Sequence, residues 1–336
     1  MVVWLKDMGA IVRGYALAPN TDPALFSVAS VSEGIDSIFG DVRDAGNLKS
    51  SMKSFEPDIV IHMAAQPLVR ASYRDPFLTY STNVMGTVNV LEAVRVCPSV
   101  RSVVNVTTDK CYENNEWIWG YRESEAMGGH DPYSSSKGCS ELITAAYQRS
   151  YFGKESKVSL GSARAGNVIG GGDWSEDRLI PDSLMAFQSD RSVRIRNPLA
   201  TRPWQHVLEP ICGYLTLAER LFCDGDTFAS GWNFGPDDCD SRPVGAVIDY
   251  LVENWPQNVS WQLDGKGQPH EAQALKLDIS KAKTRLNWFP QWRLNYALDR
   301  VIEWHQAWLV GDDMRGICLK QIYDYEFLLK QSRNCD

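Results

Sequence analysis

The sequence lacks the features that define several functional classes. None of its eight cysteines lies in a Cys-x-x-Cys pair or at ligand spacing from one of the five histidines, which argues against a metal site. A net charge of −8 argues against a nucleic-acid-binding surface. No apolar run approaches the ~20 residues that cross a bilayer. These absences predict a cytoplasmic protein with reduced thiols and with no metal, nucleic-acid or membrane partner.

The first half of the chain alternates between short apolar runs and helical patterns. This order predicts right-handed βαβ units on a parallel sheet, and therefore an α/β doubly wound fold. The expected strands are 10–17, 35–39, 58–65, 101–107 and 158–163, and the expected helices are 47–55, 75–96 and 131–151.

The pattern loosens after Gly170. We expect a dinucleotide-binding domain over 1–165 plus about 205–240, because 228–235 resemble a strand that returns to the main sheet. The segments at about 166–204 and 241–336 would form a smaller α/β substrate lobe.

A Gly-rich turn between a first strand and its helix, which would bind a dinucleotide pyrophosphate, is absent from the sequence. The sequence opens with what resembles the second half of a helix, so 10–17 would be the second strand of the sheet. Gly170-Gly171-Gly172 follows a late strand, and we interpret it as a flexible loop beside the substrate rather than as a phosphate cradle.

Tyr133 and Lys137 are four residues apart at the start of a predicted helix. Residues at this spacing share a helix face, so the Lys137 ammonium could lower the pKa of the Tyr133 phenol from its usual value of about 10. The phenol would then serve as a base for a sugar hydroxyl. The alternative is an ordinary pair of surface side chains.

Thr107, Thr108, Asp109 and Lys110 follow a buried strand. Ligands of open α/β sheets bind at the carboxyl ends of strands, so this position favours a site over a solvated turn. A hydroxyl, an acid, an amine base and a Tyr/Lys pair suit removal of a hydride from a sugar followed by elimination of water.

Other candidates have an equally good structural interpretation. Asp41-Val42 could receive an adenine amino group or could form a turn, and the small residues of Ala64-Ala65-Gln66 could lie against a flat cofactor or simply end a packed strand. Arg202 could bind a diphosphate or stack on Trp204.

Taken together, these motifs resemble the extended short-chain dehydrogenase/reductase family, and within it the nucleotide-sugar 4,6-dehydratases. The Asp109-Lys110 pair is the sharpest mark of the members acting on CDP-glucose, because relatives acting on dTDP-glucose typically have Asp-Glu there. The resemblance is carried by 14–17, 62–70, 80–87, 109–112, 119–123, 131–134, 164–174 and 202–207.

The resemblance implies a reaction. Tyr133, assisted by Lys137 and Thr108, would deprotonate the C4 hydroxyl of CDP-glucose while NAD accepts a hydride. Lys110 would be the base at C5, and Asp109 would protonate the departing C6 hydroxyl. Return of the hydride to C6 would give CDP-4-keto-6-deoxy-glucose, a precursor of the deoxysugars of surface polysaccharides such as O-antigen.

The resemblance also implies the binding residues and the assembly. The helix from Asp75 and the helix carrying Tyr133 would pair across a homodimer or a higher homo-oligomer. His206 is expected to be structural as well as a candidate substrate contact. The expected substrate contacts are Asn167, Arg202 and His206, and the expected NAD contacts are Asp41, Val42, Ala64, Ala65, Gln66, Thr107, Tyr133 and Lys137.

The chain departs from the family at its N-terminus, where relatives have a strand and a Gly-rich segment. For a polypeptide that starts at Met1, we expect poor NAD retention and marginal folding, and a start site assigned too late would explain the departure more simply. Three alternatives remain: a dehydratase for another nucleotide sugar, an epimerase, and a silent fragment that only associates with full-length subunits.

Overall fold

A four-stranded parallel sheet forms the centre of the larger lobe. The computed structural model describes residues 1–153, 155–264 and 272–333. The strand order is β3 (Ile59–His62), β4 (Ser102–Val106), β5 (Ser159–Ala165) and β9 (Gly231–Phe234). The predicted return of 228–235 to the main sheet is confirmed, since β9 pairs in parallel with β5.

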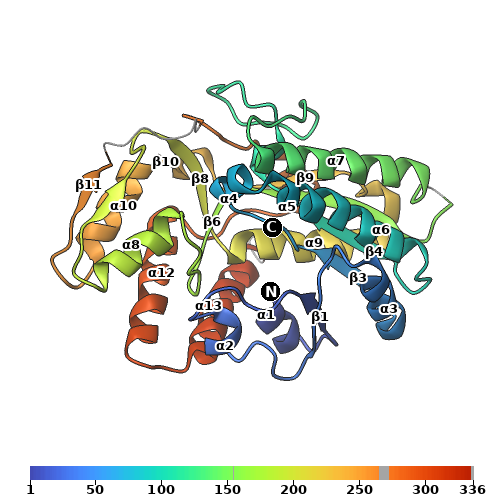
Figure 1. Cartoon of the computed structure of the whole chain (residues 1–336), viewed down its shortest axis with the longest axis horizontal. Coiled ribbons are helices and arrows are strands. Elements are labelled where there is room, and N and C mark those ends of the chain that lie inside the picture. The colour runs from blue at the N-terminus through green and yellow to red at the C-terminus, as the bar shows by residue number, and fades with distance from the viewer. Residues whose placement is uncertain (154, 265–271, 334–336) are drawn as a thin grey trace.

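Helices cover both faces of this sheet, which is why every residue of β5 is buried. α6 (Gly86–Arg95) and α7 (Pro132–Ser150) lie on one face and α9 (Leu208–Asp224) on the other, with α3 (Ala45–Phe55) packed on α6 (Figure 1). α7 begins at the N-cap Asp131, whose side chain accepts from Ser134 N, and Pro132 holds the first position. These caps place Tyr133 in the first turn.

β1 (Arg13–Ala16) and β2 (Asp36–Phe39) form a second parallel sheet. Within the described residues these two strands pair only with each other. The doubly wound α/β prediction is confirmed in its strand and helix order and its parallel pairing, but the strands fall into two sheets. α1 (Val2–Asp7) packs on α13 (Met314–Arg333), and α2 (Leu25–Val28) lies between β1 and β2 in sequence.

The helix predicted over 75–96 is present, with an irregular turn in its middle. α5 (Pro76–Tyr80) follows the short α4 (Val69–Arg74) and continues through a π-helical turn, Ser81–Met85, into α6. The turn places Asn83 inside, where its side chain donates to Gln66 O (3.1 Å) and to Ser136 Oγ (2.9 Å) and accepts from Gln66 N (2.8 Å). Such turns are frequent at functional sites.

Small sheets and three helices build the second lobe, with a core of its own. The boundaries predicted for the two lobes remain a prediction. One sheet has the order β10 (Ser241–Pro243), β8 (Thr201–His206), β6 (Asn167–Ile169), another pairs β11 (Trp261–Leu263) with β7 (Val193–Ile195), and the helices are α8 (Leu179–Phe187), α10 (Val244–Asn254) and α12 (Leu294–Leu309), with α11 (Ser280–Leu286) beside β9.

The part of the chain that the structure describes contains neither a membrane-spanning helix nor a metal-binding cluster. No helix there is both long and apolar enough to cross a membrane. No group of three or more His, Cys, Asp or Glu side chains there is placed to hold a metal ion.

The loop at Gly170-Gly171-Gly172 is closely packed. A Cβ on Gly171 would overlap the indole of Trp304 on α12, and a Cβ on Gly170 would lie 2.8 Å from Val207 Cγ1. Gly172 has φ +77°, a conformation that favours glycine. Gly171 therefore allows tight contact between this loop and α12, while Gly170 lines the cavity, beside which the loop was predicted to lie.

We predict that Gly171→Ala destabilises the fold by about 1–3 kcal/mol, because the new methyl group must displace the buried Trp304 ring. Urea unfolding followed by tryptophan fluorescence would measure the loss. Gly46→Ala in α3 is the matched control, since its Cβ would lie 3.5 Å from Asp44 Oδ1, an ordinary contact. Equal stability of the two variants would contradict the close packing of this loop.

Candidate active site

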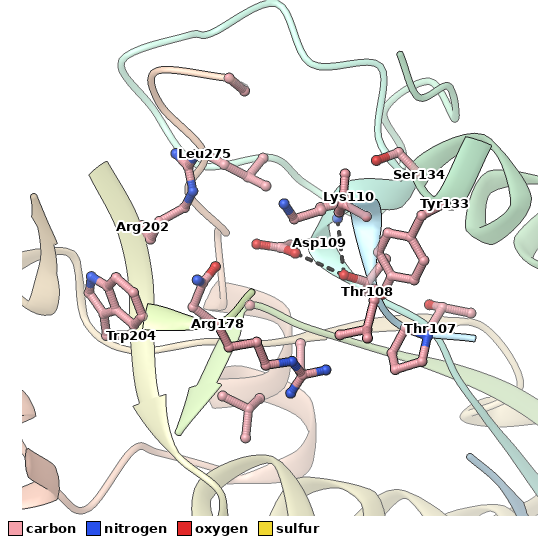
Figure 2. Close-up of a pocket in the computed structure, with 18 of the residues that line it drawn as sticks. Thr107, Thr108, Asp109, Lys110, Tyr133, Ser134, Arg178, Arg202, Trp204 and Leu275 are labelled. Carbon is pink, nitrogen blue, oxygen red and sulfur yellow. Dashed lines mark hydrogen bonds between the residues drawn. The ribbon is translucent and has the colours of Figure 1, made fainter. Parts of the chain in front are cut away.

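A cavity of about 880 Å³ lies between the carboxyl ends of the sheet strands and the second lobe. Figure 2 shows the turn after β4 and Tyr133 on one side, and Arg178, Arg202 and Trp204 on the other. The predicted residues that line this cavity are Thr107, Thr108, Asp109, Lys110, Tyr133, Asn167 and Arg202. The fold thus brings together most of the catalytic and substrate residues predicted from sequence.

Asp109 is a buried carboxyl group that faces this cavity. β4 ends at Val106, and Thr108 caps the short turn Asp109–Cys111 by accepting from Lys110 N (3.3 Å). The Thr108 hydroxyl donates to Asp109 Oδ1 at 2.9 Å, while the buried Oδ2 has no hydrogen-bond partner among the described residues. Burial raises the pKa of Asp109, with Lys110 and Thr108 opposing the rise. A carboxyl group that is more easily protonated suits a proton donor.

Tyr133 and Lys137 lie on one face of α7, but their contacts differ from the expectation. Burial raises the pKa of Tyr133 to about 12, against a smaller lowering by the Thr108 hydroxyl. Burial lowers the pKa of Lys137 to about 8, and its Nζ donates to Val106 O at 3.2 Å. The predicted lowering of the phenol pKa by Lys137 is therefore absent from this structure, because desolvation dominates at both groups.

Arg202 and Asn167 occupy neighbouring strands on the far wall. Arg202 is buried and donates to Thr201 O (2.9 Å) and Gln273 O (3.4 Å), while Asn167 pairs with Trp204 in the sheet. The Trp204 indole donates to Arg242 O at 2.9 Å.

His206 lies behind this wall and does not line the cavity. Its ring packs on Trp292 at 4.6 Å between centroids, and its Nδ1 accepts from Leu208 N at 3.3 Å. Burial, aided by Arg300, lowers its pKa to about 3, so the ring is neutral. The structure supports the structural interpretation of His206.

The cofactor candidates follow the ends of β2 and β3. Asp41 forms an ion pair with Arg43 at 2.5 Å, and Val42 is buried against Gly86. Ala64 and Ala65 are half-buried, and Gln66 is the residue fixed by Asn83.

The chemistry of these groups fits the nicotinamide–ribose half of NAD. Ala64 and Ala65 present no side-chain atom beyond Cβ, so a flat ring can approach the backbone there. Within the described residues Lys137 makes one hydrogen bond, which leaves two of its three N–H groups for hydroxyl oxygens.

Sequence reasoning missed three arginines that line the cavity. Arg70 of α4 and Arg196 after β7 both contact Asp177 Oδ1, at 3.1 and 3.4 Å, and Arg178 contacts Asp173 at 3.1 Å. Arg178 and Arg196 lie outside the motifs that carry the resemblance, so their only signal was their charge, whereas Arg70 ends the segment 62–70 that carries it. With Arg202 they give the cavity the cationic groups that an anionic ligand needs.

The sequence profile of the GDP-mannose 4,6 dehydratase family matches residues 24–301. The chain therefore belongs to this family, within the extended short-chain dehydrogenases/reductases that its motifs resemble. It is 53% identical over 327 residues to the CDP-glucose 4,6-dehydratase of Salmonella typhimurium, which covers 96% of this chain and 91% of that protein.

Solved structures show the same fold at lower identity. UDP-glucose 4-epimerase of Thermotoga maritima has a TM-score of 0.79 and 21% identity, covering 92% of this chain and 95% of that chain. dTDP-glucose 4,6-dehydratase of Bacillus anthracis has a TM-score of 0.72 and 19% identity, covering 91% of each chain.

We predict that Asp109→Asn stabilises the folded chain by about 0.5–2 kcal/mol at pH 7. The pKa of Asp109 is higher in the folded chain than its ordinary value of 3.8, so ionisation of the buried carboxyl opposes folding as pH rises. The gain should vanish as the pH falls below that ordinary value. Urea unfolding at several pH values measures the difference.

Asp41→Asn is the control of opposite sign. Arg43 lowers the pKa of Asp41, so this variant should lose a little stability at pH 7, within about 0–1 kcal/mol for an ion pair near the surface. A loss of stability on Asp109→Asn at pH 7 would show that burial does not dominate at Asp109.

Proposed function

We propose that this chain catalyses dehydration of CDP-glucose to CDP-4-keto-6-deoxy-glucose with NAD as its cofactor. One observation carries the proposal. The buried carboxyl group of Asp109, one oxygen of which has no hydrogen-bond partner among the described residues, lies beside Lys110 and Tyr133 in the cavity. The 53% identity to a CDP-glucose 4,6-dehydratase supports the choice of substrate.

Each step of the reaction has a residue to perform it. When bound, NAD supplies the acceptor and later the donor of a hydride. Tyr133 takes the proton from the C4 hydroxyl, with the Thr108 hydroxyl beside its oxygen. Lys110 removes the C5 proton that the C4 ketone has made acidic, and Asp109 gives a proton to the departing C6 hydroxyl.

Binding would use residues of both lobes. Ala64, Ala65, Gln66, Thr107 and Lys137 would hold the nicotinamide half of the cofactor, while Asp41 and Val42 would line the adenine side. Arg202 would pair with the diphosphate of the substrate, and Asn167 would contact the sugar. Apart from Lys137 on α7, these cofactor and substrate residues lie at strand ends or on the wall that faces them.

The pair Asp109-Lys110 favours dehydration over C4 epimerisation, since epimerisation needs no acid and base for elimination. A dehydratase for another nucleotide sugar remains the nearest alternative, because the cavity arginines would pair with the diphosphate of any such substrate. A silent fragment would bind neither cofactor nor substrate. The predicted cytoplasmic location stays a prediction.

We predict that the purified chain with NAD converts CDP-glucose to its 4-keto-6-deoxy product. Chromatography of the sugar nucleotides measures this conversion. Tyr133→Phe should lower kcat by about 10²–10⁴-fold because the C4 base is lost. Lys110→Ala should slow elimination by a similar factor while oxidation at C4 continues. The reduced cofactor NADH should therefore accumulate, and its absorbance measures the amount.

Lys49→Ala, on the exposed surface of α3, is the matched lysine control and should keep full activity. Formation of CDP-galactose would favour the epimerase. Full elimination by Lys110→Ala would overturn its role at C5. Turnover of UDP- or dTDP-glucose in preference to CDP-glucose would identify a different dehydratase.

We also propose that α5 and α7 pair with the same helices of a second copy. These neighbouring helices carry large apolar side chains that face solvent in the single chain: Phe77 is 81% exposed, Leu142 61% and Met85, between α5 and α6, 52%. Exposed apolar groups that gather on adjacent helices are typical of a protein–protein interface. A second copy of this chain fits the homodimer or higher homo-oligomer expected from its sequence.

We predict that Phe77→Glu and Leu142→Glu shift the chain toward monomers in sedimentation experiments, because a carboxylate would be buried against apolar groups. Phe327→Glu replaces another exposed aromatic residue on α13 and should leave the assembly unchanged. If both interface variants sediment as the unmodified oligomer does, the contact between copies lies elsewhere.

A further inference from the structure

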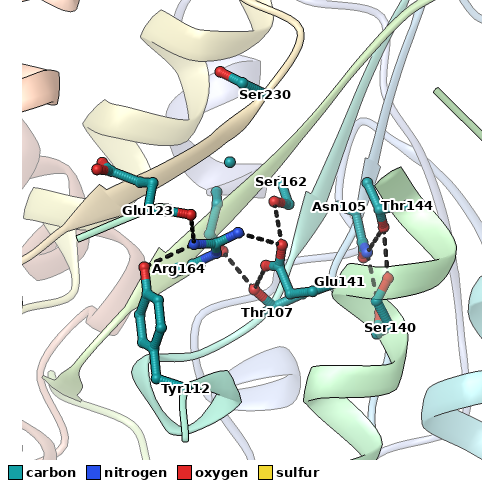
Figure 3. Close-up of polar contacts among 12 residues, drawn as sticks. Asn105, Thr107, Tyr112, Glu123, Ser140, Glu141, Thr144, Ser162, Arg164 and Ser230 are labelled. Carbon is teal, nitrogen blue, oxygen red and sulfur yellow. Dashed lines mark hydrogen bonds and ion pairs between the residues drawn. The ribbon is translucent and has the colours of Figure 1, made fainter. Parts of the chain in front are cut away.

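A buried polar network lies behind the wall that carries Thr108, Asp109 and Lys110. At its centre are Glu141 of α7 and Arg164 of β5, each about 5% exposed, with their side chains 2.7 Å apart (Figure 3). A charged pair this deeply buried needs further partners, because the desolvation of both groups is costly. Neither residue was among the candidates from sequence.

The partners of the pair come from the elements that build the site. Glu141 Oε1 accepts from the hydroxyl of Thr107, and Oε2 accepts from Ser162 Oγ at 2.7 Å. Arg164 Nη1 donates to Tyr112 Oη at 2.7 Å and to Glu123 O at 3.1 Å. The pair thus joins α7, the end of β4 and the segment that follows residues 108–110, which we call the catalytic turn.

Glu141 is four residues after Lys137 and eight after Tyr133, so all three share one face of α7. Thr107 directly precedes the catalytic turn at 108–110. The carboxylate of Glu141 therefore holds the two halves of the proposed catalytic set together, one half on the helix and one on the turn.

The pair also sets the charge around Lys137. Burial alone would raise the pKa of Glu141, but Arg164, Thr107 and Ser162 hold it below its usual value, so the carboxyl group is ionised. This carboxylate opposes the lowering of the Lys137 pKa by burial.

Among the described residues, the other titratable groups that interact with Lys137 are Cys111 and His62, and both are neutral. Burial raises the pKa of the Cys111 thiol, and burial together with Lys137 lowers the pKa of His62 to about 3. Glu141 is therefore the nearby anion that supports the charge of Lys137, with Arg164 as its counterion.

We infer that Glu141 and Arg164 are a positioning pair: they hold the catalytic turn against α7 and place a compensated carboxylate behind Lys137. This inference rests on the proposed function for its effect on turnover, and it extends that function to residues that touch neither substrate nor cofactor. Removal of the carboxylate should misplace Thr108 and Asp109 relative to Tyr133 and leave Arg164 as an uncompensated buried charge.

A second polar cluster on the same helix provides a matched control. Asn105 of β4 donates to Ser140 Oγ (3.0 Å) and to Thr144 Oγ1 (2.7 Å), so it ties α7 to β4 without contacting the catalytic residues (Figure 3). Thr144→Val removes one of these buried hydrogen bonds at nearly constant volume. A merely structural role of Glu141 would make its loss resemble that of Thr144.

We predict that Glu141→Gln lowers kcat for CDP-glucose by about 10- to 100-fold, as a misplaced catalytic group does. KM should stay within about twofold, since the substrate contacts remain. The alkaline limb of the kcat profile should move to lower pH by about one unit or more, because loss of the carboxylate lowers the pKa of Lys137.

A titration without substrate checks the charge directly. The lysine side chains are labelled with ¹³C at Cε and followed by NMR, and the resonance that is absent from Lys137→Met is assigned to Lys137. The midpoint of its pH titration should lie near 8 in the unmodified chain. The midpoint should fall in Glu141→Gln and return to within about half a unit in Glu141→Gln/Arg164→Met, where both charges are gone. The double variant should still turn over about tenfold slower.

The outcomes separate the alternatives. An unchanged Lys137 midpoint in Glu141→Gln, or an equal loss of kcat in Thr144→Val, would overturn the inference. If Glu141→Gln does not fold, the double variant decides, and full kcat there would overturn it as well. Inactivity of the unmodified chain would contradict the proposed function alone, because the lysine titration needs no turnover.

Discussion

Burial of ionisable groups at the carboxyl edge of the four-stranded sheet is the constraint on which the site depends. Asp109, Tyr133, Lys137, Glu141 and Arg164 are all buried there. Each would be costly alone. Hydrogen bonds or an ion pair with other elements stabilise Lys137, Glu141 and Arg164, whereas Asp109 accepts from the adjacent Thr108. Asp109 Oδ2 and Arg164 Nε have no hydrogen-bond partner among the described residues, and Asp109 lines the cavity, where a ligand would meet it.

Much of the fold could be predicted because parallel strands buried on both faces are almost continuously apolar. β4 and β9 lie within the runs expected for them, and β5 begins within its run and extends past it to Ala165. The caps Asp75 and Asp131 start their helices as predicted. The π-helical turn at Ser81–Met85 could not be predicted, because its inward Asn83 bonds to Gln66 and Ser136, residues that no local pattern links to it.

Site residues that belong to short sequence motifs could be predicted. Residues that meet only through packing of segments far apart in the sequence were missed. Asp109-Lys110 and Tyr133-x-x-x-Lys137 are local patterns, whereas Glu141 and Arg164 meet only because α7 packs on β5. The helical spacing of Tyr133 and Lys137 predicted a lowered pKa for the Tyr133 phenol, whereas burial raises it. Spacing along a helix carries no information about desolvation. The fold itself is shared by epimerases and dehydratases, so the reaction must be argued from the cavity residues.

The hydroxyl group of Thr108 has one hydrogen, and two neighbours, Asp109 and Tyr133, could accept it. It donates to Asp109 in this structure, and it also opposes the rise in the pKa of Tyr133. Once Asp109 carries a proton of its own, the direction of that hydrogen bond can reverse, with Asp109 as the donor. The threonine hydrogen is then free to turn to the phenolic oxygen and stabilise a tyrosinate. Protonation of the acid Asp109 would therefore favour the ionised form of the base Tyr133. The rotation of one hydroxyl group, that of Thr108, would couple the protonation states of the two groups.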